Sequence, residues 1–313
     1  MESHRVFSHI LNGRMIVSRS IGQGFTLILM LATVGCSADP VNERSIYNLS
    51  NKVDESSGIV SSRTYPGILW THEDNGLSNN LYAVDGQGDF IFKASVSGAM
   101  NVDWEDIAID GEGYLYVADS GNNKNKRKDL LVYKIREPNP QDPASVATVA
   151  KRIRFRYPSQ KDFPDPSDLN YDAEALFFDD GKLYLLTKNR SDTTTDLYRF
   201  PTLQATDEIE LEKISTFELG YDVLNDGGKV TAADISPDGK TLAMLCYDAV
   251  YLFDKPTQGD DWFAGDHRQV MLDQAVTKQA EGLAFHDGHL VLTNEEGEIH
   301  HMWGVLDGLT SYP

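Results

Sequence analysis

The segment DAEALFFDDGKLYLLTK, residues 172–188, contains the pattern that decides the fold of this chain. A carboxylate, Glu174, opens a short apolar run, the pair Asp180-Gly181 follows it, and a second apolar run ends at Thr187. Asp-Gly between two short apolar runs is the strongest short-range signal for a β-hairpin, because both residues tolerate positive φ. The segment therefore predicts two antiparallel strands joined by a tight turn.

The same pattern occurs five times along the chain. Its units open near the following residues: Glu55, Trp104, Ala173, Ala232 and Ala280. The turn is Asp-Gly in four units and Pro66-Gly67 in the first; a third apolar run follows in every unit, and a fourth follows in the first four units. Four short antiparallel strands repeated at this spacing, with no long helical pattern, predict an all-β fold, a single β-propeller.

Five blades are favoured, although the fifth unit lacks a fourth strand of its own. The segment RSIYNLS, residues 44–50, precedes the first unit without a partner and could complete the fifth, which would close the ring through an N-terminal strand. Residues 138–170 could hold a sixth, degenerate blade, but their high proline content favours a loop. We therefore expect one propeller domain over residues 36–313, with five blades rather than six.

The N-terminal segment has the features of an export signal. After three arginines comes the apolar run FTLILMLATV, which is long enough for a signal peptide and too short to span a bilayer. Its end resembles a bacterial lipoprotein cleavage site, in which Cys36 would become the lipid-bearing N-terminus of the mature chain. We expect a signal peptide over residues 1–35, starting at Met1 or Met15, and an exported protein that is periplasmic or lipid-anchored in a bacterial outer membrane. Cleavage after Gly35 or Ala38 by an ordinary signal peptidase is the alternative.

The charge of the chain limits its partners. It has 28 Lys and Arg residues against 48 Asp and Glu residues, a formal net charge of -20. Such a charge repels phosphate backbones and anionic lipid, so we expect no nucleic acid and no membrane contact beyond the lipid anchor. The second of two cysteines, Cys246, lies in the apolar run LAMLCY and is expected to be a buried core residue, and the Cys and His spacings fit no zinc site.

The propeller geometry predicts where ligands bind. The innermost strand of each blade lines the central channel, and its first residues share a face with the loop between the second and third strands. We expect this face to bind a small molecule or a protein through these side chains: His72, Asp74, Asp119, Asn123, Lys188, Tyr247 and Glu295.

Three glutamates, Glu105, Glu174 and Glu281, occupy one position of the repeat, which Ser57 and Ala233 take in the first and fourth units. Three carboxylates around one axis repel each other, so they need a cation, protons or neighbouring Lys and Arg. Oxygen ligands and flexible geometry suit Ca²⁺, so a calcium site on these three glutamates is one prediction. The alternative is that each accepts hydrogen bonds from backbone N–H groups of the next blade, with basic residues such as Lys188, Arg190 and Arg127 neutralising the rest.

Several segments resemble a group of exported bacterial propeller proteins within the superfamily that includes TolB-like and gluconolactonase-like propellers. These segments are LWTHEDNG (69–76), NVDWEDIAID (101–110), LYVADSGNN (115–123), DAEALFFDDGKLYLLTK (172–188) and VTAADISPDGKTLA (230–243). The resemblance implies the propeller fold from about Glu55 to Glu296. In gluconolactonase-like members an acidic residue that opens a blade binds a divalent ion together with Asn and Asp from other blades, and the resemblance implies Glu105, Glu174 or Glu281 as its counterpart.

Two functions of different classes remain open. The first is a cell-envelope binding or scaffold protein whose acidic channel face holds a divalent cation. The second is a Ca²⁺-dependent hydrolase of a lactone or phosphoester, in which a carboxylate with a raised pKa serves as the base. The sequence contains no Gly-x-Ser-x-Gly elbow and no His spacing typical of a triad, which favours the binding protein.

Overall fold

The computed structural model describes residues 45–308, except 54, 75, 77 and 221–227, together with residues 311–312. The predicted signal peptide, the start at Met1 or Met15 and the predicted lipidation site Cys36 lie outside the described residues. No helix within the described residues is long and apolar enough to cross a membrane.

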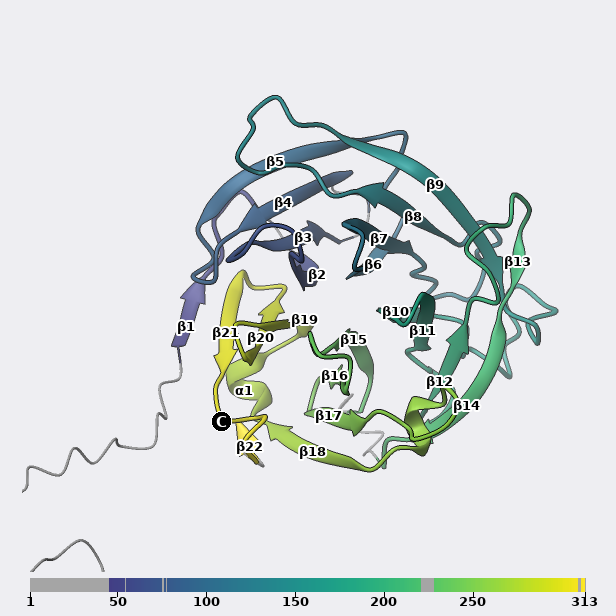
Figure 1. Cartoon of the computed structure of the whole chain (residues 1–313). Coiled ribbons are helices and arrows are strands. Elements are labelled where there is room, and N and C mark those ends of the chain that lie inside the picture. The colour runs from purple at the N-terminus through teal and green to yellow at the C-terminus, as the bar shows by residue number, and fades with distance from the viewer. Residues whose placement is uncertain are drawn as a thin grey trace, which may run out of the picture. The chain divides into compact units, whose positions relative to one another are not determined.

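The described chain forms five blades of four strands around a central channel, which confirms the predicted five-bladed propeller (Figure 1). The innermost strands are β2 (Ser56–Ser61), β6 (Trp104–Ile109), β10 (Ala173–Asp179), β15 (Val230–Ile235) and β19 (Ala280–His286). The second strands are β3 (Leu69–Glu73), β7 (Tyr114–Asp119), β11 (Lys182–Thr187), β16 (Thr241–Cys246) and β20 (His289–Asn294).

The third strands are β4 (Asn80–Val84), β8 (Leu131–Arg136), β12 (Thr194–Arg199), β17 (Ala249–Asp254) and β21 (Glu298–Met302). The outermost strands are β5 (Phe90–Ser97), β9 (Ala147–Arg156), β14 (Glu212–Glu218), β18 (His267–Leu272) and, for the fifth blade, β1 (Ser45–Asn48). Neighbouring strands within each blade are antiparallel, as the hairpin pattern predicts.

The N-terminal strand closes the ring, as predicted from the sequence. β1 pairs antiparallel with β21, with Ser45 opposite His301 and Asn48 opposite Glu298. The last blade therefore takes its outer strand from the opposite end of the described chain (Figure 1). Ring closure therefore depends on contacts between residues near the two ends of the described chain. Such contacts are entropically costly until the intervening blades have formed.

Strand pairings and short elements that the sequence pattern did not predict lie at the outer edges. β5 and β9 pair in parallel and join the first two blades, β13 (Ile209–Glu210) pairs with β9, and β22 (Ser311–Tyr312) pairs with β18. The helical elements are η1 (Trp262–Ala264) and α1 (Gln274–Thr277). The proposed sixth blade is absent from the described residues: β9 uses part of the 138–170 stretch, and no named strand lies between Arg156 and Ala173.

The Asp-Gly turns differ in how tightly they close. Asp180 and Gly181 have φ values of 47° and 78°, and Asp287 and Gly288 have 43° and 84°, so both residues of these two turns are left-handed. The second blade instead places positive φ at Gly113, with φ 78°. Asp-Gly marks the hairpins correctly, but only the third and fifth blades have the two-residue turn that it favours most.

Burial follows from the stacking of the blades around the channel. Every residue of β6, β15 and β19 is buried, because a neighbouring blade covers each face of the sheet. Trp70 and Trp104 are fully buried in the cluster between the first two blades, and Cys246 is buried between the third and fourth. The polar residues that begin the innermost strands are thereby held at one end of the channel.

Candidate functional site

A cavity of 190 Å³ lies at the end of the channel where the innermost strands begin. Its lining includes Glu105, Glu174 and Glu281, the three glutamates of the repeat, and five of the predicted ligand-binding residues: Asp74, Asn123, Lys188, Tyr247 and Glu295. Ser57, Asp103, Arg190 and Gln279 complete the lining. Residues that are far apart in sequence therefore meet around one space.

Two of the three glutamates have a basic partner. Lys188 places its Nζ 2.8 Å from Glu174 Oε2 and 3.9 Å from Glu281 Oε1. Arg190 Nη2 lies 3.3 Å from Glu174 Oε1, and the Tyr247 hydroxyl donates a hydrogen bond to Glu281. Lys188 and Arg190 thus neutralise this side of the cavity.

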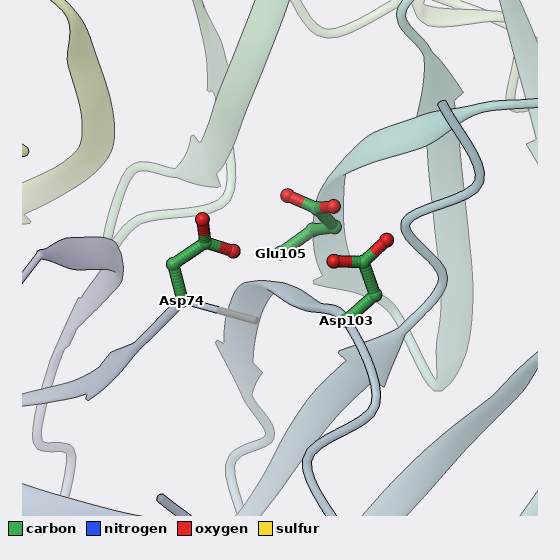
Figure 2. Close-up of side chains that lie close together, drawn as sticks. All are labelled: Asp74, Asp103 and Glu105. Atoms are coloured by element: carbon green, nitrogen blue, oxygen red, sulfur yellow. The ribbon is translucent and has the colours of Figure 1, made fainter. Parts of the chain in front are cut away.

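Glu105 is in a different situation, although it has the same place in the repeat. It is 7% exposed, and its carboxylate forms no hydrogen bond or ion pair with any described residue. Carboxylate oxygens of Glu105, Asp74 and Asp103 lie within 4.8 Å of one another, and we call these three side chains the carboxylate cluster. Figure 2 shows the three carboxyl groups turned toward a common space.

The electrostatics of the carboxylate cluster follow from this lack of partners. Burial raises the pKa of Glu105 well above its usual range, and the nearby charges of Glu174, Asp172 and Asp103 raise it further. Burial and the charge of Asp74 also raise the pKa of Asp103 to about 6. Without a bound cation, Glu105 therefore favours its protonated form more strongly than an exposed glutamate does.

Backbone contacts fix the carboxylate cluster in position. Asp74 follows β3, and its N–H donates to Glu55 O at 3.1 Å. Asp103 precedes β6, and its N–H donates to Asp119 Oδ1 at 3.2 Å. Glu105 lies where the pairing of β6 with β7 is irregular, and such a bulge turns a side chain away from the regular alternation, here into the channel.

The repeat position of the fourth unit was assigned wrongly from the sequence. The pairing irregularity in β15 falls between Val230 and Ala232, so Thr231 and not Ala233 is the equivalent of Glu105. The Thr231 hydroxyl donates to Ala280 O at 2.8 Å, just as the Ser57 hydroxyl of the first unit donates to the Glu105 carbonyl at 3.0 Å. The hydroxyl-bearing units thus use this position to join neighbouring blades.

The blade-joining carboxylates are aspartates, not the three glutamates. Asp106 Oδ2 accepts from the N–H groups of Leu176 at 2.8 Å and Ala233 at 3.2 Å. Asp234 Oδ2 accepts from Phe285 N–H at 2.8 Å. Among the described residues, no backbone N–H donates to the side chains of the three glutamates, so the acceptor role expected of them belongs to Asp106 and Asp234.

Two predicted ligand-binding residues do not line the cavity. His72 is fully buried, with Nδ1 3.1 Å from Glu73 O and its ring edge against Trp104. Asp119 is 1% exposed, pairs with Arg127 at 2.8 Å and accepts from the Asp103 N–H. Asp119 thus supports the carboxylate cluster by holding the backbone of Asp103, while His72 belongs to the packing around Trp104.

Gly121 also shapes the cluster and was not singled out from the sequence. A Cβ at this position would lie 1.9 Å from Glu105 Oε1 and 2.5 Å from Asp103 Oδ2. Only a glycine leaves these oxygens room to approach one another. No pattern in the sequence predicts this role, because Gly121 lies in the polar stretch Ser120 to Asn123, whose composition is typical of an exposed turn.

The sequence matches no protein-family model and no curated protein. Among solved structures, virginiamycin B lyase from Staphylococcus aureus is similar at 12% identity, with 82% of this chain and 68% of that chain covered and a TM-score of 0.38. The Dos1 propeller is similar at 12% identity, with 79% of this chain and 56% of that chain covered and a TM-score of 0.37. At this level of similarity the activity of neither protein carries over to this chain.

Proposed function

We propose that this protein is an exported binding or scaffold propeller whose channel cavity holds a divalent cation, Ca²⁺, at the carboxylate cluster. The observation that carries the proposal is Glu105, a carboxylate that is 7% exposed and forms no hydrogen bond or ion pair with any described residue. A buried carboxylate is normally paired, protonated or bound to a metal. Two further carboxylates within 4.8 Å make the metal the most favourable of these partners.

The donor set fits calcium better than a softer metal. The carboxylate cluster supplies oxygen ligands from two blades. The described lining of the cavity contains no His or Cys, which zinc and copper sites favour. Ca²⁺ accepts six to eight oxygens in flexible geometry, so water can complete its shell.

The proposed site is displaced from the centre of the glutamate ring. Lys188 lies between Glu174 and Glu281, and its ammonium would repel a cation placed there. The carboxylate cluster lies on the side of the first two blades, and none of its three carboxylates forms an ion pair with a described residue. Of the three glutamates that the sequence predicts as calcium ligands, only Glu105 therefore binds Ca²⁺ in this proposal. Glu174 and Glu281 form ion pairs with Lys188 instead.

Thermal unfolding with Ca²⁺ or with EGTA tests the proposal. We expect Ca²⁺ to raise the melting temperature of the wild type in a concentration-dependent way, because it binds only the folded state. Glu105→Gln should abolish this shift, and it should stabilise the metal-free protein by about 1–3 kcal/mol, because it removes a buried carboxylate without a partner. Glu112→Gln, an exposed glutamate in a hairpin turn, is the matched control and should change neither quantity.

Either of two results would overturn the calcium site. One is a wild-type protein whose melting temperature does not respond to Ca²⁺. The other is a Glu105→Gln variant that responds to Ca²⁺ as strongly as the wild type does.

A Ca²⁺-dependent hydrolase of a lactone or phosphoester is the second candidate. It is favoured by the position of Lys188 and Arg190, which line the same cavity as the carboxylate cluster and could stabilise a developing oxyanion. Glu295 lines the cavity too, and burial raises its pKa, which suits a general base that activates water. Ca²⁺-dependent turnover of p-nitrophenyl phosphate or δ-valerolactone that Glu295→Gln abolishes, with Ca²⁺ binding retained, would select the hydrolase.

The envelope location is part of the proposal and is tested separately. It is supported by the apolar run of residues 25–34 and by the small residue before Cys36. In bacteria grown with labelled palmitate, we expect the wild-type chain to take up label and Cys36→Ser to take up none. If the wild-type chain is found in the periplasm without label, it is exported by ordinary signal-peptidase cleavage and carries no lipid anchor.

A further inference from the structure

A second, larger cavity of 760 Å³ adjoins the channel cavity. The two share four lining residues: Lys188, Arg190, Tyr247 and Gln279. Among the described lining residues of the larger cavity are four cationic side chains, Lys188, Arg190, Lys229 and Lys278, and one carboxylate, that of Glu296; we call the four cations the basic wall. Three of these cations have carboxylate partners: Lys188 pairs with Glu174 and Glu281, Arg190 with Asp172 and Glu174, and Lys278 with Glu296 and Glu298. The wall therefore presents cationic groups to the cavity, although carboxylates beside or behind them balance much of their charge.

Arg190 is held so that one nitrogen stays available. Its Nε donates to Asp172 Oδ2 at 2.7 Å, and its Nη2 contacts Asp172, Glu174 and Asn123. Its Nη1 forms no hydrogen bond with any described residue, and the side chain is 28% exposed. A guanidinium fixed on one side and open on the other is a pre-organised donor for an anionic oxygen, because little side-chain entropy is lost on binding.

Lys278, Tyr247 and Gln279 also present hydrogen-bond donors to the larger cavity. Lys278 pairs with Glu296 at 2.7 Å and with Glu298 at 2.8 Å; Glu296 is 62% exposed and Glu298 is 22% exposed, so water weakens the first pair more than the second. Lys278 therefore still attracts an incoming anion. Tyr247 and Gln279 add neutral hydrogen-bonding groups between the cations.

We infer that the ligand of this propeller is a small molecule that carries an oxyanion, either a carboxylate or a phosphate, and binds between the cation and the basic wall. The inference rests on the proposed function, because the cation supplies one half of the site. The shared lining residues join the carboxylate cluster at one end to the basic wall at the other. The combined space is in the range of known small-molecule sites.

The arrangement makes the two ligands interdependent. Without the cation, the carboxylate cluster repels an anion that enters the channel cavity. With the cation bound, that end becomes attractive, and an oxygen of the anion can complete the coordination shell of the metal. Cation and anion should therefore bind cooperatively, and each should raise the affinity of the other by the same factor.

Calorimetric titration of the metal-free protein tests the inference, with inorganic phosphate and succinate as separate probes. We expect at least one of them to bind about tenfold more tightly when Ca²⁺ is present, and Ca²⁺ to bind more tightly by that factor when the anion is present. Phosphate binding alone identifies a phosphate ligand, and succinate binding alone identifies a carboxylate.

Lys278→Gln tests the basic wall without disturbing the carboxylate cluster. Because Lys278 is 31% exposed and pairs with partly exposed glutamates, the variant should fold, bind Ca²⁺ normally and bind the anion several-fold more weakly. Lys240→Gln removes the same charge from a 77% exposed side chain in a hairpin turn and should leave anion binding unchanged.

The outcomes separate the inference from the proposed function. Ca²⁺ binding without binding of either anion overturns the inference and leaves the calcium site intact. Equal anion affinity with and without Ca²⁺ overturns the shared site, and an unchanged anion affinity in Lys278→Gln overturns the basic wall. Absence of Ca²⁺ binding overturns the proposed function, whatever the anions do.

Discussion

Two adjacent carboxylates of β6 show how local surroundings decide the role of a residue. Asp106 reaches backbone N–H groups of two other blades and so holds the channel together. Glu105, one residue earlier, meets Asp74 and Asp103 instead and has no hydrogen-bond donor among the described residues. The chemical group is the same, so the difference lies in which neighbours the fold brings within reach.

Gly121→Ala tests whether the carboxylate cluster needs its present spacing. The new Cβ would lie 1.9 Å from Glu105 Oε1, so the two carboxylates must separate. We expect Ca²⁺ affinity to fall at least about tenfold and the metal-free protein to lose about 1–3 kcal/mol of unfolding free energy from the clash. Gly111→Ala is the matched control, because no atom lies within 4 Å of a Cβ there. Wild-type Ca²⁺ affinity in Gly121→Ala would contradict the spacing argument.

His289, on the face with the hairpin turns, should make the unfolding free energy depend on pH. Burial and the neighbouring His301, which shares a 2.7 Å hydrogen bond with it, lower the pKa of His289 to about 4. An unfolded histidine has a pKa of about 6.5, so between pH 6.5 and 4 the unfolded state binds more protons. This contribution to the unfolding free energy is intact above that window and is lost as the pH falls through it.

The test compares the wild type with His289→Leu by urea unfolding at several pH values. The variant lacks the titrating group, so the unfolding free energy of the wild type minus that of the variant should decrease from pH 7 to pH 4. A difference that does not vary with pH would show that His289 takes up its proton equally in both states.

At the scale of elements, the irregular pairing near the start of each innermost strand is the repeated device. It falls at Ser57, Glu105, Glu174, Thr231 and Glu281. The hydroxyl of Ser57 and that of Thr231 each bond a backbone carbonyl of the next blade, while the glutamates face the cavity. The strand geometry repeats, but the side chain at this one position differs in role: Thr231 joins two blades, the glutamates line the cavity, and Ser57 does both.

Asp234 in β15 is the element-scale test of blade joining. Asp234→Ala leaves the N–H groups of Phe285 and Ile235 without their acceptor, and we expect a loss of about 1–3 kcal/mol in urea unfolding. Asp234→Asn keeps an amide oxygen as an acceptor and should lose clearly less. Equal losses in the two variants would mean that packing, and not these hydrogen bonds, gives Asp234 its importance.

At the scale of the whole molecule, ring closure depends on the N-terminal strand. β1 supplies the outer strand of the fifth blade and covers the edge of β21. An uncovered strand edge exposes unpaired backbone groups and promotes association with other chains. We therefore expect the closing strand to stabilise the fifth blade and to disfavour association of chains through the edge of β21.

A chain that lacks residues 1–50 tests this closure. We expect its melting temperature to fall by roughly 5 °C or more and its tendency to aggregate to rise, because the fifth blade keeps only three strands. A peptide of sequence SIYNLS, residues 45–50, should restore part of the loss by adding a strand to β21, whereas a scrambled peptide should not. An unchanged melting temperature would contradict a stabilising role for β1.

The sequence by itself determined the five-bladed ring, the order of its strands and the strand that closes it. Hairpins are local, so apolar runs and Asp-Gly turns report them directly, and their repetition implies the architecture. Only the tertiary structure decided which carboxylates form a site: Lys188 reaches Glu174 and Glu281, Gly121 admits Glu105 to Asp103, and Asp106 takes the blade-joining role. These pairings depend on distances between side chains of different blades, which no local pattern of residues encodes.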